Sequence, residues 1–179
     1  MSTYRRFTRF STTTKPPRID QIPDGGICLS AFVILSPPAK PNQVLMGKLN
    51  TSAPWEHLGA LDKGRAETNS KGWMLPSSQL MLFESPQEAA SRILIEQLSI
   101  TDQKLAGPYV FSEVYGPQNH WDLEFIFTGD RGEVPRSDAW SELKFVDTDA
   151  VKKEDIVRSH EDILAHVGRW SRPASSQQV

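Results

Sequence analysis

The chain has 179 residues, enough for one domain to bury a core without help from metal ions or disulfides. Charged residues make up 23% of the sequence and apolar residues 38%, a composition that excludes a fully disordered chain. The longest apolar stretch, residues 27–35, is too short to cross a bilayer. The single cysteine, Cys28, cannot form an internal disulfide and is expected to be a small buried thiol. We therefore expect a cytoplasmic protein that does not enter a membrane.

The net charge of −2 is unevenly distributed along the chain. Before the first acidic residue, Asp20, the charged side chains are all Lys or Arg, so the chain begins with a basic segment. This start, rich in Arg, Ser and Thr, is consistent with an organellar transit peptide, a nucleic-acid-binding arm or an unstructured tail. Composition does not choose among the three. We expect residues 1–22 to be a flexible basic segment, residues 23–171 to form one domain, and residues 172–179 to be a loose tail.

The first half of the domain predicts two strands and an insertion. Residues 25–36 begin with turn glycines and continue into β-branched and aromatic residues, which is typical of a strand buried on both faces. After a proline-rich turn, residues 43–49 predict a strand that pairs with the first as a hairpin. Residues 51–71 lose this pattern and predict an insertion that carries a short helix at about residues 55–62.

A helix is predicted from Pro86 to about Leu98 because its start signal is complete. Ser85 is placed to cap the helix, Pro86 takes the first helical position, and Glu88 can return a bond to the amide of the cap. Ala90, Leu94 and Leu98 recur at a spacing of four residues and should form the buried face.

Two more strands follow, at residues 109–115 and 121–128, and they flank a turn-rich segment as in a hairpin. Alternation places the aromatic residues of the second strand on one face and Asp122 and Glu124 on the other. A last strand around residues 143–146 precedes a second helix. Mixed strands and helices predict an α/β or α+β sandwich.

The last helix has its own start signal. Ser159 and Asp162 occupy the positions of a second capping box, ahead of the apolar residues Ile163, Leu164 and Val167. No internal repeat accompanies these elements.

The segment at residues 72–100 carries a motif and reads GWMLPSSQLMLFESPQEAASRILIEQLSI. It resembles the signature of the Nudix hydrolase family, a strand ending in W-x-L-P-G-G followed by a loop and helix of the form G-x5-E-x7-R-E-U-x-E-E-x-G-U, with U a bulky apolar residue. The matching residues are Trp73, Leu75, Pro76, Glu84, Arg92, Leu94, Glu96 and Ile100. The departures are Ser77 and Ser78 for the two glycines, Ile93 and Gln97 for two glutamates, and Ser99 for the closing glycine. The resemblance implies an α/β fold, an α/β/α sandwich around a mixed β-sheet.

The resemblance also implies what the departures do. In the family, three helix carboxylates, at positions that correspond to 93, 96 and 97, hold the divalent cations that bridge substrate phosphates. Here Glu96 is the one carboxylate left in that set, so Mg²⁺ or Mn²⁺ is expected only if the protein is active, and turnover should be weak or absent. Glu84 is the second catalytic candidate, and the resemblance implies that it bonds Arg92 and ties the loop to the helix. Arg92, Trp73 and Pro76 keep the shape of the motif.

Several other residues have side chains that could take part in metal binding, catalysis or base stacking, and each also has an ordinary structural role. Glu113, Glu124 and Glu142 lie on or beside predicted strands and could replace lost metal ligands, but acidic residues there more often face water. His120 could act as a base, although a solvent-exposed turn histidine is the more common case. His57, His160 and His166 show no ligand spacing, and the surroundings of Ser77 and Ser78 lack a nucleophile motif. Trp55, Trp73 and Trp121 could stack on a base or pack in the core.

Three functional hypotheses remain open. The first is a Nudix-type protein that binds a nucleotide-linked pyrophosphate with little hydrolysis. The second is an active pyrophosphohydrolase that uses Glu96 and carboxylates from elsewhere in the chain. The third is a non-catalytic module that binds a partner protein or RNA through the basic start or residues 51–71. The sequence shows no P-loop, no dinucleotide-binding turn and no zinc motif, and it leaves the oligomeric state open.

Overall fold

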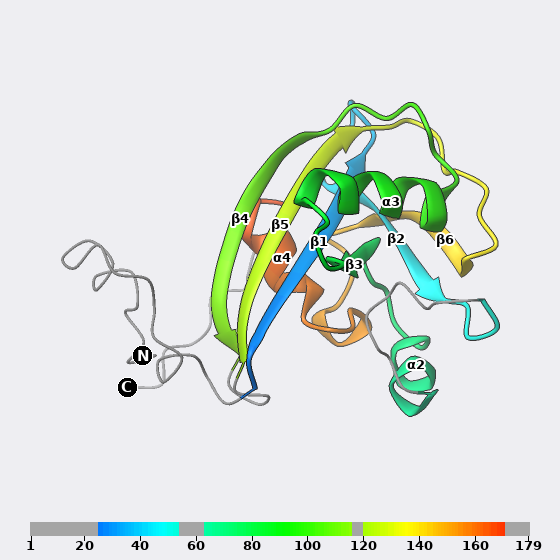
Figure 1. Cartoon of the computed structure of the whole chain (residues 1–179). Helices are drawn as coiled ribbons and strands as arrows, with labels where there is room; N and C mark the ends of the chain where they lie inside the picture. Colours follow the sequence, from blue (N-terminus) through cyan, green and yellow to red (C-terminus); the bar gives the residue numbers. More distant parts are fainter. Residues whose placement is uncertain (1–24, 54–62, 116–119, 171–179) are drawn as a thin grey trace, which may run out of the picture.

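A computed structural model describes residues 25–53, 63–115 and 120–170 and shows a mixed four-stranded sheet with helices on both faces (Figure 1). The strands lie in the order β3-β1-β5-β4. β1 (Ile27–Ser36) runs parallel to β5 (His120–Asp130) and antiparallel to β3 (Ser77–Gln79), and β4 (Ala106–Tyr115) is antiparallel to β5. The predicted α/β class and the predicted hairpin of β4 and β5 are therefore confirmed.

The second sheet has two strands and corrects one expectation. β2 (Gln43–Leu49) forms where a strand was predicted, but it pairs antiparallel with β6 (Trp140–Asp147) rather than with β1. The hairpin prediction was wrong because β1 pairs with β5 along one edge and with β3 at residues 30–32 along the other, while β2 pairs with β6.

β1 supplies the core on both faces of the large sheet. Its side chains Ala31, Val33 and Leu35 point to the face covered by α3 (Pro86–Leu98). The alternate side chains Phe32 and Ile34 point to the opposite face and contact Ile163 and Leu164 of α4 (His160–His166). The strand is thus buried on both faces over its second half, as its apolar run predicts.

The helix α3 begins and ends as its sequence predicts. The Ser85 hydroxyl accepts the amide of Glu88, and the Glu88 carboxylate accepts the amide of Ser85, which completes the capping box. At the other end Ser99 adopts a left-handed conformation with φ of 55°, the backbone that favours glycine at this position. The buried face contains the predicted Ala90, Leu94 and Leu98, together with Ala89, Ile93 and Gln97.

The helix α4 corrects a second expectation. Ser159 stands directly before the helix, but its φ is 56° and its side chain makes no capping bond. An N-cap side chain reaches the helix amides from an extended backbone, and the left-handed turn at Arg158 and Ser159 prevents this. The other helices among the described residues are short: α2 (Lys63–Asn69) and the 3₁₀ helix η2 (Lys153–Asp155).

Several expectations fall on residues outside the described ranges. These are the basic segment 1–22, the tail 172–179 and the helix expected at 55–62, and they stay predictions. Within the described ranges, no helix combines the length and the apolar character needed to span a membrane.

Candidate functional site

The loop between β3 and α3 is tied to the helix by the ion pair that the motif implies. Arg92 donates from Nε to one oxygen of Glu84 at 2.7 Å and from Nη2 to the other at 2.8 Å. These bonds raise the pKa of the Arg92 guanidinium above its ordinary value. Arg92 also donates to the Ser78 hydroxyl and the Gln79 carbonyl, while Glu84 accepts the amide of Met81. The pair therefore fixes strand end, loop and helix together.

The two positions that lack the motif's glutamates both face the core. Ile93 is fully buried among apolar side chains. Gln97 is 4% exposed, and its amide is paired with the backbone of Ser77: Oε1 accepts the Ser77 amide at 3.2 Å and Nε2 donates to the Ser77 carbonyl at 2.8 Å. The oxygen that Gln97 could offer to a metal ion is thus engaged within the protein.

Glu96 lies on the exposed side of α3, and its carboxylate stands 3.9 Å from the Arg92 guanidinium. Trp73 is almost fully buried and joins the core, with the ammonium groups of Lys48 and Lys144 over its ring at 4.7 and 4.5 Å. Pro76 accepts the amide of Val33 through its carbonyl and so holds the motif strand on β1. In the part of the chain that the structure describes, no group of three or more His, Cys, Asp or Glu is arranged to hold a metal ion.

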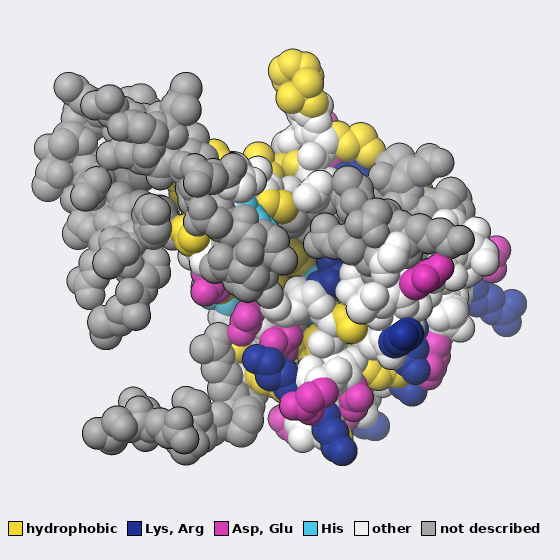
Figure 2. All heavy atoms as spheres, turned by 90° about the horizontal axis from the view of Figure 1, so that it is seen from below, with side chains coloured by type: hydrophobic (Ala, Val, Ile, Leu, Met, Phe, Trp, Pro, Cys, Tyr) yellow, Lys and Arg dark blue, Asp and Glu magenta, His cyan; other side chains and the backbone are white. Residues whose placement is uncertain are grey.

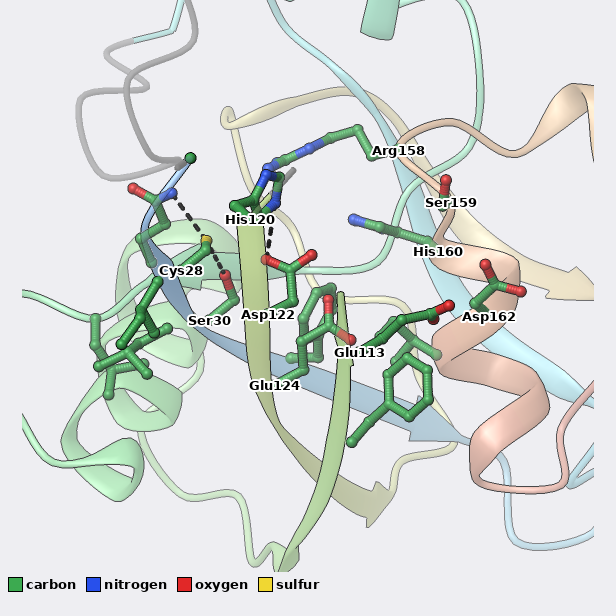
Figure 3. A pocket seen from close by; sticks show the side chains of 18 of the residues that line it. Cys28, Ser30, Glu113, His120, Asp122, Glu124, Arg158, Ser159, His160 and Asp162 are labelled. Carbon is green, nitrogen blue, oxygen red and sulfur yellow. Dashed lines mark hydrogen bonds and ion pairs between the residues drawn. The ribbon is translucent and has the colours of Figure 1, made fainter. Parts of the chain in front are cut away.

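A cavity of about 940 Å³ opens on the face of the sheet opposite α3. Strand register explains its lining, because Cys28 pairs with Asp122, Ser30 with Glu124, and Asp122 with Glu113 on β4. Side chains at paired positions lie on the same face, so a polar row crosses three strands. The turn before α4 and the helix itself add Arg158, His160 and Asp162, and these side chains converge on the same space (Figure 3). Acidic and histidine side chains also gather close together on the face that Figure 2 shows.

The carboxyl groups of this cavity perturb one another. Burial raises the pKa of Glu124 to about 8, and the nearby carboxylates of Asp122, Glu113 and Asp162 add to the shift. Burial also raises the pKa of Asp122, although the neighbouring His120 opposes this. The His120 Nε2 lies 2.9 Å from Asp122. At neutral pH Glu124 therefore holds a proton and can donate a hydrogen bond.

His160 is 2% exposed and is fixed in one tautomer. Its Nδ1 accepts the amide of Leu75 at 2.9 Å, so the ring proton is on Nε2. Burial, with a smaller contribution from Arg158, lowers the pKa of His160 well below its ordinary value, and the ring is neutral. Figure 3 shows the ring directed into the cavity.

Three sequence expectations about these residues need correction. His120 is not a solvent-exposed turn residue, because it begins β5 and bonds Asp122. Glu124 does not simply face water, since it is largely buried in the cavity. Cys28 is half-buried and lines the cavity rather than the core.

The other candidates divide between two places. Glu113 joins Glu124 in the cavity, whereas Glu142 lies on β6 and pairs with Lys48 and Lys144. Trp121 is half-buried and donates to the Ser112 hydroxyl. His166 lies against Phe111, and the structure does not describe His57 or Trp55.

Sequence comparisons find no relative, since no protein-family model matches the chain and no curated protein sequence matches it.

Solved structures, by contrast, share the fold. The MutT protein from Methanosarcina mazei Go1 matches with a TM-score of 0.57 at 14% identity, over 82% of this chain and 96% of that one. The MutT NUDIX hydrolase from Burkholderia pseudomallei matches with a TM-score of 0.55 at 14% identity, over 79% and 98%. The E. coli dihydroneopterin triphosphate pyrophosphohydrolase matches with a TM-score of 0.50 at 14% identity, over 68% and 82%. At these identities the likeness establishes the fold.

Proposed function

The chain has the Nudix fold, and on that premise we propose that it binds a nucleotide-type ligand containing a pyrophosphate, with weak or absent hydrolysis. The observation that carries the second half of this proposal is the cyclic pair of hydrogen bonds between Gln97 and Ser77. The family's pattern has a metal-binding glutamate at this position. Here Gln97 has a neutral amide, and both its oxygen and its nitrogen are already hydrogen-bonded to the Ser77 backbone.

The residues on α3 do not fit a resident divalent cation. Mg²⁺ and Mn²⁺ take hard oxygen ligands, usually with one or two carboxylates. Ile93 offers no ligand atom, Gln97 is engaged, and the remaining carboxylate, Glu96, stands beside the cationic Arg92. Because metal ions neutralise the charge that develops in phosphoryl transfer, losing this set should remove several kcal/mol of barrier lowering.

The cavity supports the binding half of the proposal. Its volume of about 940 Å³ lies within the range of small-molecule sites, which is roughly 300–1,000 Å³. Glu124 and His160 present polar hydrogens to it, and Asp122 presents an acceptor, as a ligand with a polar heterocyclic end requires. Arg158, at the turn before α4, is the Lys or Arg side chain among the described residues that line the cavity.

Glu84 and Arg92 have a structural role in this proposal. Their bidentate contact holds the loop in the shape that the family's motif adopts, and both charges are satisfied within the protein. Glu96 is the one carboxylate of the motif helix that remains a candidate for residual catalysis.

The test is turnover of purified protein with Mg²⁺ or Mn²⁺ against ADP-ribose, dinucleoside polyphosphates and nucleoside triphosphates, beside calorimetric binding of the same compounds. We expect binding of at least one compound without added metal, and turnover orders of magnitude below the roughly 1–10³ s⁻¹ of ordinary enzymes. Turnover in that ordinary range, abolished by Glu96→Gln and unaffected by Glu142→Gln, would instead establish the active enzyme that recruits carboxylates from elsewhere.

A further inference from the structure

The turn between β3 and α3 exposes apolar side chains that the core does not use. Leu82 is 84% exposed and Phe83 is 96% exposed, and Met81, at the start of the turn, is 43% exposed. Apolar surface gains free energy when it leaves water, and neighbouring exposed apolar residues on a folded protein often mark an interaction surface. We call Leu82 and Phe83 the apolar knob.

The fold holds the knob in one position. The Glu84 amide donates to the Met81 carbonyl at 3.0 Å, and the Met81 amide donates to the Glu84 carboxylate at 2.8 Å, so both ends of the turn are fixed. Phe83 lies between them with a φ of 67°, a left-handed backbone that a bulky residue adopts at a cost in free energy. The chain thus keeps a large aromatic side chain where the backbone favours glycine.

A shallow hollow lies next to the knob, on the outer face of α3. Its volume is about 420 Å³, and its lining residues are Gln87, Glu88, Ser91, Arg92, Ile95 and Glu96. Arg92 joins the two features, because it lines the hollow and also bonds Glu84 at the end of the turn. Ile95 is 54% exposed and gives the hollow its apolar surface. One surface of the protein therefore carries both a projection and a depression.

The charged groups around the hollow have partners within the chain. Glu88 closes the capping box of α3, Arg92 bonds Glu84 through two nitrogens, and Glu96 stands 3.9 Å from Arg92. An ionic occupant would compete with these contacts, whereas an apolar occupant needs only the exposed surface of Ile95. Since charged residues are depleted from the centres of protein interfaces, the hollow suits an uncharged apolar occupant.

We infer that the occupant of the hollow is the knob of a second copy of this chain. In a two-fold dimer the same surface faces itself, so the knob of each copy meets the hollow of the other and both contacts form together. The knob carries no charge, so this meeting removes no ion from water.

The size of this surface sets the expected strength of the dimer. The exposed side chains of the knob and the hollow offer on the order of half of the roughly 800 Å² that each partner buries in a standard interface, so the dimer should be weak. The cavity opens on the opposite face of the sheet and should stay accessible in the dimer. The inference thus goes beyond the proposed function and does not depend on it.

Sedimentation equilibrium of the full chain at a series of concentrations tests the contact. We expect a reversible equilibrium of monomer and dimer, with a dissociation constant on the order of 100 µM. A chain that is still monomeric at about ten times that concentration would overturn the inference. So would oligomers that grow steadily with concentration, since a closed two-fold contact stops at the dimer.

Variants locate the contact. Phe83→Gly removes the aromatic part of the knob and suits the left-handed backbone, so it should weaken the dimer at least tenfold without lowering the melting temperature of the monomer. Ile95→Glu places a charge in the hollow at an exposed position and should weaken the dimer by a similar factor. Val110→Ser is the matched control, because Val110 is 51% exposed on β4. The dissociation constant of this control should not change, and weakening equal to that of Phe83→Gly would contradict the inference.

Mixing the two variants gives the sharpest test. Phe83→Gly lacks the aromatic knob, and Ile95→Glu has a charged hollow, so neither variant forms the full contact with itself. In the mixture the Ile95→Glu copy supplies an intact knob and the Phe83→Gly copy supplies an intact hollow, which restores one of the two contacts. Labelled Phe83→Gly should bind Ile95→Glu at least fivefold more tightly than it binds itself. Equal affinities would mean that the exposed apolar side chains associate without this geometry, and the inference would fail.

Discussion

The two faces of the four-stranded sheet differ in the number of carboxyl side chains that they bring together. On the face that α3 covers, Ile93 and Gln97 stand where the Nudix pattern has glutamates, and both are buried and uncharged. On the face that α4 covers, Glu113, Asp122 and Glu124 converge on a cavity together with Asp162. Negative charge is thus sparse where the motif would hold metal ions and dense where the fold encloses a ligand-sized space.

The two faces also differ in how their polar groups are paired within the protein. The α3 face is satisfied internally, because Gln97 bonds the Ser77 backbone and Arg92 bonds Glu84. On the cavity face, burial and the neighbouring carboxylates raise the pKa of Glu124 to about 8, and the Nε2–H of His160 makes no hydrogen bond to the residues that the structure describes. A carboxyl group whose pKa a cavity raises is a candidate for ligand binding at that cavity.

The largest effect should follow from returning a glutamate to the α3 face. Ile93→Glu places a carboxylate where the side chain is fully buried among apolar residues. The cost should be about 5 kcal/mol or more at pH 8, from lost packing and from burial of a charge without a partner. Thermal melting followed by circular dichroism measures it.

Ile95→Glu provides the control on the same helix, since Ile95 is 54% exposed and its replacement should change the free energy of unfolding by no more than about 0.5 kcal/mol. If Ile93→Glu melts at the same temperature as the unmodified chain, position 93 is open to solvent. That result would contradict the claim that the α3 face excludes a carboxylate at this position.

On the cavity face, removing a carboxylate should stabilise the protein, and the gain should depend on pH. The folded pKa of Glu124 is about 8, against an ordinary value of 4.5. Between these values the folded state keeps a proton that the unfolded state has released, so stability falls as pH rises through this window and levels off above it. Glu124→Gln removes that loss, with an expected gain of about 5 kcal/mol at pH 9 and almost none at pH 4.

Urea denaturation of Glu124→Gln across this pH range gives the profile directly. Glu142→Gln should show no such pH-dependent gain, because contacts with Lys144 and Lys48 lower the pKa of that carboxyl group. A Glu124→Gln variant whose stability tracks the unmodified chain at every pH would mean that the cavity does not raise the pKa of Glu124.

A smaller effect tests the ion pair on the α3 face. Arg92→Lys keeps the positive charge but loses the bidentate contact with Glu84 and the bonds to Ser78 and Gln79. We expect a loss of about 2 kcal/mol and faster hydrogen exchange at the Met81 amide, which Glu84 accepts. Arg136→Lys, at an exposed position, should change neither quantity, and similar exchange rates in both variants would show that the pair does not hold the loop.

Local signals in the sequence predicted much of the fold. The capping box at Ser85 and the buried spacing of α3 depend on neighbouring residues, and both formed as predicted. The partner of β2 could not be predicted in this way, because that partner is β6, which lies far from β2 in the sequence. Ser159 has the right residue type for a cap, but Arg158 and Ser159 adopt a left-handed backbone that residue type alone does not predict.

In the candidate site too, contacts between residues close in the sequence were predicted and contacts between distant residues were not. The motif predicted the contact of Glu84 with Arg92, since both residues lie within one short segment. Alternation placed Asp122 and Glu124 on one face of their strand, but their convergence with Glu113 and His160 required strand register and the position of α4. The polar row at Cys28 and Ser30 was a signal in the sequence, because two small polar side chains alternate within an otherwise apolar strand.

The contrast between the faces is tested most directly by titrating the protein with Mn²⁺, with and without ADP-ribose, and following bound Mn²⁺ by electron paramagnetic resonance. Because Ile93 and Gln97 provide no ligand on α3, we predict no site with a dissociation constant in the micromolar range that Glu96→Gln removes. A Mn²⁺ ion held at micromolar concentration and lost in Glu96→Gln would contradict the account.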